Sequence, residues 1–199
     1  MNEALTRAKQ NIARARHLVG LHASLVAVTT DALDLSDILR ASLVLGVSAL
    51  DAFIHDLVRA GMVEQYKGTR PKTDAYRAFR LPLEILHRAV LSPTTADWLN
   101  DAVRDALSWQ SFQRADKIAS ALAHICPTSL WEAVARRLRA PAETIRRELE
   151  LIVDRRNKIA HEADMNPASP SERWPIDAQQ VSEALDFLEA VCEAILAVV

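Results

Sequence analysis

Residues 37–65 read DILRASLVLGVSALDAFIHDLVRAGMVEQ, the most apolar helix-forming segment of the chain. Its leucine, valine, isoleucine and phenylalanine side chains recur at spacings of three and four residues, on more than one side of a helix. A helix of this kind is buried on several sides, so the segment predicts the central helix of an all-α domain. Gly46 and Ser48 are small residues, and we expect both to let a neighbouring helix approach closely.

Helices are predicted along nearly all of the remaining chain. The first covers residues 2–28, and its apolar stripe is formed by Leu18, Leu21, Leu25 and Val28. Additional short helices are expected in the middle of the chain, at residues 73–79, 83–90, 96–107, 114–125 and 129–138. Two longer helices follow at residues 141–162 and 177–199, joined by a proline-containing loop at 165–175. The sequence therefore predicts a single domain over residues 1–199, an up-and-down helical bundle.

Composition and charge narrow the possible functions. The chain has 199 residues and a net charge of −2, which argues against binding nucleic acid through a bulk positive potential. Cys126 and Cys192 form neither a disulfide framework nor a zinc-binding spacing. The N-terminus lacks a signal-peptide core, and the longest apolar run, residues 43–50, is far shorter than the ~20 residues of a membrane span. We therefore expect a cytoplasmic protein with no membrane contact, no metal and no cofactor.

Residues 154–161, DRRNKIAH, are the only segment with the composition of an active site. They place three cationic side chains, one amide and one histidine on a single helix. Each residue advances a helix by about 100°, so Asn157 and His161 share a face and Lys158 flanks them. Arg156 lies five residues before His161, well round the helix. A two-fold dimer that packed this helix against its own copy would bring Arg156 of one chain near His161 of the other.

The segment Arg156-Asn157-Lys158-Ile159-Ala160-His161 resembles the R-x4-6-H motif of HEPN domains, in the common form R-N-x-x-x-H. Three further stretches, residues 48–57, 106–113 and 151–176, are similar to the bacterial HEPN branch often called RiboL-PSP-HEPN. The likeness extends from about residue 35 to the end of the chain. It implies a HEPN-type helical bundle.

The resemblance also implies a metal-independent endoribonuclease that works as a homodimer on RNA. Attack of the 2′-OH on the adjacent phosphate would leave a 2′,3′-cyclic phosphate and a 5′-OH. His161 would act as the acid or base, and Arg156 would hold the phosphate and stabilise its charge. Asn157 is expected to orient these groups as a hydrogen-bond donor, while Lys158 and Arg155 are candidate phosphate contacts. A toxin or phage-defence role, with an antitoxin or other partner protein, would fit such an enzyme.

Asp51 is the candidate supporting residue on the facing helix, because it interrupts the most apolar segment and stands four residues before His55. We expect its carboxylate to hold Arg156 or His161. An Asp–His or Asp–Arg pair can instead simply satisfy buried polarity. The four tryptophans are expected to pack between helices, although Trp174, just past the motif, could also stack on a base.

Other interpretations of residues 155–161 remain open at this point. Cationic residues near a helix C-terminus are favoured by the helix dipole, so the segment could be a solvated surface. A HEPN domain could also bind nucleic acid, or dimerise and regulate a partner, without cutting RNA. A purely structural helical oligomer would leave Arg156 and His161 apart and exposed.

Overall fold

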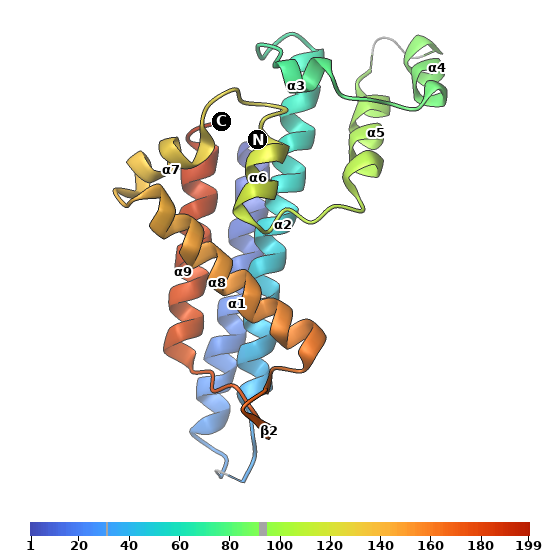
Figure 1. Ribbon diagram of the computed structural model, residues 1–199. Coiled ribbons are helices and arrows are strands. Elements are labelled where there is room, and N and C mark those ends of the chain that lie inside the picture. Colours follow the sequence, from blue (N-terminus) through green and yellow to red (C-terminus); the bar gives the residue numbers. More distant parts are fainter. Residues whose placement is uncertain (31, 92–94) are drawn as a thin grey trace.

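Among the described residues the four longest helices are α1 (Asn2–Val26), α2 (Ser36–Tyr66), α8 (Ala142–Glu162) and α9 (Ala178–Leu196), and the chain reverses direction from each to the next (Figure 1). The computed structural model describes residues 1–30, 32–91 and 95–199. Helices α1, α2 and α9 run side by side, and α8 crosses them diagonally (Figure 1). The all-α, up-and-down bundle predicted from the sequence is confirmed.

In the described part of the segment between α2 and α8 there are five shorter helices. They are α3 (Asp74–Arg77), α4 (Leu83–Leu91), α5 (Asp97–Leu107), α6 (Ala115–Leu122) and α7 (Leu130–Leu138). Helix α5 packs against α2, and α4 packs against α5 at the outer edge of the molecule (Figure 1). Helices α6 and α7 both pack against α8, so the middle of the chain lies around the helix that carries the DRRNKIAH segment.

Helix α2 is the central helix, as predicted, and it contacts α1, α5, α6, α8 and α9. Its buried residues include Leu50, Phe53 and Leu57. A Cβ atom added to Gly46 would clash with Leu185 Cδ2, so this glycine admits α9 at close range. Ser48 is exposed and its hydroxyl donates to the carbonyl of Val44. The expectation that a small residue lets a neighbouring helix approach closely is therefore correct for Gly46 and wrong for Ser48.

Helix α2 is also long and apolar enough to cross a membrane, by length and composition alone. In the described part of the chain 56% of its most apolar window is buried inside the protein, and core helices commonly meet the same criterion. The property is therefore weak evidence for a membrane span.

Helix α1 buries a different face from the one predicted. Its buried residues are Ala4, Ala8, Ile12 and Ala15. Leu21 is 46% exposed, and Val28, beyond the end of α1, is 78% exposed. The last turns of α1 extend past the start of α9 (Figure 1), so its leucines there have fewer neighbours to pack against. The predicted apolar stripe is wrong because Ile12 and the three alanines form the buried face of α1, the helix that packs against α2 and α9.

The segment after α8 is a hairpin and not the predicted irregular loop. Strand β1 (Met165–Asn166) pairs antiparallel with β2 (Ser169–Arg173), with Met165 opposite Arg173. The side chain of Asn166 accepts a hydrogen bond from the N–H of Ala168 at 3.0 Å, which closes the turn. Proline is compatible with such a short edge ladder, which explains why the proline content misled the prediction.

Candidate functional site

Arg156, Asn157 and His161 line one pocket of about 500 Å³ on α8. The opposite wall is the loop after α5 and the start of α6, including Trp109, Gln113 and Lys117. The five-residue spacing predicted that Arg156 and His161 are not close neighbours on one helix and that a two-fold dimer would bring them together. Within one chain the two residues already border the same pocket.

Arg156 is held beside the pocket with part of its hydrogen-bonding capacity unused. Its Nη1 donates to Asn157 Oδ1 at 3.0 Å, and its buried Nε has no hydrogen-bond partner among the described residues. His161 is exposed at the last turn of α8. A guanidinium can bind a phosphate through two donors, and an imidazole can transfer a proton near neutral pH. The pocket therefore combines an anion-binding group with an acid–base group.

Asp51 supports the opposite wall of the pocket instead of the motif. Its Oδ1 accepts a hydrogen bond from the backbone N–H of Phe112 at 2.5 Å. The ring of Phe112 lies 4.5 Å from that of His55, between centroids, and Phe112 is buried. A buried N–H needs an acceptor, and the loop after α5 brings this one to Asp51. Among the described residues the Asp51 carboxylate contacts neither Arg156 nor His161 and instead fixes the loop that faces them.

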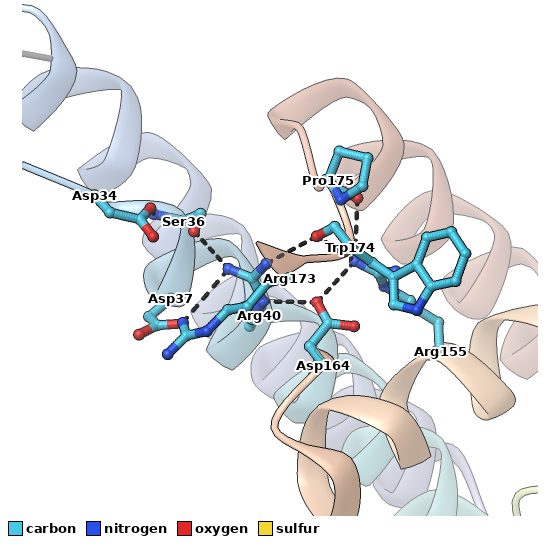
Figure 2. Close-up of polar contacts among 9 residues, drawn as sticks. All are labelled: Asp34, Ser36, Asp37, Arg40, Arg155, Asp164, Arg173, Trp174 and Pro175. Atoms are coloured by element: carbon cyan, nitrogen blue, oxygen red, sulfur yellow. Dashed lines mark hydrogen bonds and ion pairs between the residues drawn. The ribbon is translucent and has the colours of Figure 1, made fainter. Parts of the chain in front are cut away.

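Arg155 does not line this pocket and belongs to a polar network around the buried carboxylate of Asp164 (Figure 2). Its Nη2 donates to Asp164 Oδ2 at 2.8 Å and to the carbonyls of Trp174 and Pro175, each at 3.1 Å. Burial lowers the pKa of Arg155, the neighbouring Arg40 lowers it further, and Asp164 opposes both. The hydrogen bonds of Arg155 therefore go to groups within the protein, which does not support its assignment as a phosphate contact.

Asp164 is the residue of this region that the sequence reasoning missed. Its side chain is fully buried, and Oδ2 accepts from Arg40 Nε at 2.7 Å as well as from Arg155 (Figure 2). Its N–H donates to the carbonyl of Lys158 at 3.0 Å, and its carbonyl accepts from the N–H of Trp174 at 2.9 Å. Asp164 thus joins the end of α8 to α2 and to the segment after β2.

The backbone around Asp164 explains how the chain leaves α8. Ala163 and Asp164 both adopt the left-handed conformation, with φ of 51° and 60°. Non-glycine residues adopt it at a cost, which surrounding contacts must offset. The sequence signal was Arg40, whose charge stands within the mostly apolar run of residues 38–50 and needs a partner when buried.

Lys158 and Trp174 contact each other outside the pocket. Lys158 Nζ lies 5.5 Å from the centre of the Trp174 ring, within the range of a cation–π interaction. Trp174 is half-buried, and its backbone carbonyl accepts from both Arg40 and Arg155. It serves as a loop anchor. Lys158 is exposed on the helix beside it.

The tryptophans differ in their surroundings. Trp131 is buried and its Nε1 donates to the carbonyl of Ala115 at 2.9 Å. Trp98 packs edge-on against Tyr66. Trp109 is 81% exposed, so the expectation that it packs between helices is wrong.

Within residues 1–30, 32–91 and 95–199, no three His, Cys, Asp or Glu side chains come together as a possible metal site.

Comparison with known proteins identifies the family. The family model described as RiboL-PSP-HEPN matches residues 9–198. No curated protein and no solved structure matches the chain. Because the family match covers nearly the whole sequence, the chain belongs to the RiboL-PSP-HEPN family.

Proposed function

We propose that this protein is a metal-independent endoribonuclease that cleaves RNA by attack of the 2′-OH on the adjacent phosphate. Membership of the HEPN family commonly implies ribonuclease activity. The observation that carries the proposal is the single pocket lined by Arg156, Asn157 and His161. A phosphodiester there would meet an arginine and a histidine together.

The proposed reaction needs only groups that the RNA and this pocket supply. The 2′-oxygen bonds to phosphorus as its proton leaves, the P–O5′ bond breaks, and the departing O5′ takes up a proton. His161 is the acid–base group for these proton transfers. Arg156 stabilises the charge that builds on the phosphate oxygens. Asn157 accepts from Arg156 through Oδ1, which orients the guanidinium and leaves the amide N–H groups free to donate.

The proposal also covers the cellular location, the oligomeric state and the biological role of the protein. We propose that the protein acts in the cytoplasm as a homodimer, in a toxin-like or phage-defence role that an antitoxin or other partner protein would control. Family membership supports RNA as substrate and dimerisation in general terms.

Replacement of His161 tests the proposal directly. We expect His161→Ala and Arg156→Ala to reduce cleavage of single-stranded RNA by about 10²- to 10⁴-fold, because each removes a group acting in the transition state. Wild-type products should carry 2′,3′-cyclic phosphate and 5′-OH ends, and EDTA should not change the rate. Arg146→Ala is the matched control, because this arginine on α8 lines a different pocket.

The controls exclude an indirect effect of the substitutions. Both variants should keep the helical circular dichroism and the sedimentation mass of the wild-type dimer. Undiminished cleavage by His161→Ala would overturn the proposal. RNA binding by the wild type without any cleavage would favour a non-catalytic module that regulates a partner.

A further inference from the structure

Trp109 is the feature that neither the fold nor the proposed chemistry explains. It stands just after α5, and 81% of its surface is exposed. A tryptophan gains stability mainly by burying its large ring, and this ring buries very little. It nevertheless lines the same pocket as Arg156 and His161.

The loop that carries Trp109 is firmly anchored on both sides. The N–H of Gln110 donates to the carbonyl of Leu107 at 2.9 Å, and the N–H of Phe112 donates to Asp51. Phe112 and Gln113 are both buried. The loop therefore directs Phe112 inward and leaves Trp109 outward, so little conformational freedom is lost when a ligand meets the indole.

The charges around the indole indicate what kind of ligand it meets. Lys117 lines the same pocket, is exposed and forms no ion pair among the described residues. Arg114 is also on this wall, where it pairs with Asp154 at 3.0 Å. An aromatic face beside cationic side chains suits a single nucleic-acid strand, whose bases stack while its phosphates contact the cations.

We propose that Trp109 is a stacking platform for an unpaired base next to the phosphate held by Arg156. The inference rests on the proposed function and defines its substrate as single-stranded RNA, because a base within a duplex is already stacked on its neighbours. Trp174 does not take this role, since its ring is half-buried and Lys158 lies over it.

Binding to a non-cleavable strand tests the platform with the intact protein. The probe is a short single-stranded RNA of mixed sequence with 2′-O-methyl groups, which lacks the nucleophile. We expect Trp109→Ala to weaken binding by roughly 5- to 150-fold, the range for loss of one stacked base. Trp109→Phe should retain most of the affinity, whereas Trp109→Leu should resemble the alanine variant. Leu83→Ala is the control, because Leu83 is equally exposed but lies on α4, away from the pocket.

Two further probes separate stacking from other effects. The wild type should bind an abasic strand about as weakly as Trp109→Ala binds the intact strand. Trp109→Ala should bind the abasic strand with the same affinity as the intact strand. For the paired duplex, the affinity of Trp109→Ala should be no lower than that of the wild type. Equal affinity of Trp109→Ala and wild type for the intact strand would overturn the inference. A lower sedimentation mass of Trp109→Ala would also overturn it, because Trp109 would then be covered by a second copy.

The same experiments distinguish this inference from the proposed function. If the wild type fails to cut the unmodified strand but binding depends on Trp109, the nuclease proposal fails and the platform stands. If the strand is cut and Trp109→Ala binds and cuts like the wild type, the platform fails and the nuclease proposal stands.

Discussion

Asp164 is buried between the guanidinium groups of Arg40 and Arg155, three residues after His161 (Figure 2). Removing the shared carboxylate would leave two cations close together, one of them almost fully buried, with only the exposed carboxylate of Asp37 near Arg40. We expect Asp164→Ala to lower the free energy of unfolding by about 3 kcal/mol, the lower end for breaking a buried pair, because Arg155 is partly exposed. Urea denaturation followed by circular dichroism measures this.

The control for Asp164 lies in the same network. Asp37 also contacts Arg40, and pairs with Arg173, but its carboxylate is 65% exposed. Exposed pairs contribute little, so Asp37→Ala should cost less than about 1 kcal/mol. Similar losses from the two substitutions would show that burial of the Asp164 network is not what stabilises the end of α8.

The site residues differ in how far the sequence could predict them. Arg156, Asn157 and His161 lie within six residues of one helix, and the family motif grouped them, although helical periodicity placed only Asn157 on the same face as His161. The partners of Asp51 and Arg155 come from remote segments, the loop at Phe112 and the turn at Trp174. Such contacts depend on tertiary packing, so no local pattern could reveal them.

At the scale of the elements, two glycines in long helices should respond in opposite ways to alanine. A Cβ at Gly61 on α2 would lie 2.6 Å from Ile125 Cγ2 and 2.8 Å from Ile125 Cβ, atoms close to the backbone that cannot easily move. A Cβ at Gly20 on α1 meets nothing within 4 Å. We expect Gly61→Ala to destabilise the protein by about 1–2 kcal/mol, because overpacking exceeds the gain in helix propensity.

Gly20→Ala provides the matched comparison for this prediction. It should stabilise the protein by about 0.5–1 kcal/mol, since only the helix-propensity gain applies there. Thermal and urea unfolding of both variants would measure the difference. Stabilisation by Gly61→Ala would mean that Ile125 can move aside and that the α2 contact is looser than the structure shows.

The helices themselves were largely predictable, and the faces they bury were less so. The boundaries of α2 and α8 agree with the predicted ranges to within one residue at each end, because their apolar periodicity is long and regular. The stripe of α1 was mistaken because burial depends on where neighbouring helices end. The hairpin of β1 and β2 was missed because its pairing involves few residues and a side-chain turn at Asn166.

Across the whole molecule, packing is uneven, and α4 and α7 show this most directly. Both helices have nine residues. Helix α7 packs against α8 and α9 and buries Leu130 and Val134. Helix α4 packs against α5, while Leu83 is 82% exposed and Val90 is 75% exposed. Equal length makes the pair a controlled comparison of packing.

The rate of amide hydrogen exchange in each helix should therefore depend on burial and not on helix length. An isolated helix of this length is marginal in water, so α4 should open at little cost and exchange quickly. The amides of α7 should exchange far more slowly. For amides in the centre of α2, the free energy of opening should approach the global free energy of unfolding, about 5–15 kcal/mol for a typical domain. Exchange followed by mass spectrometry of peptides from each helix measures this order. Protection of α4 equal to that of α7 would require a further surface covering its exposed leucines, because α5 alone leaves them open to solvent.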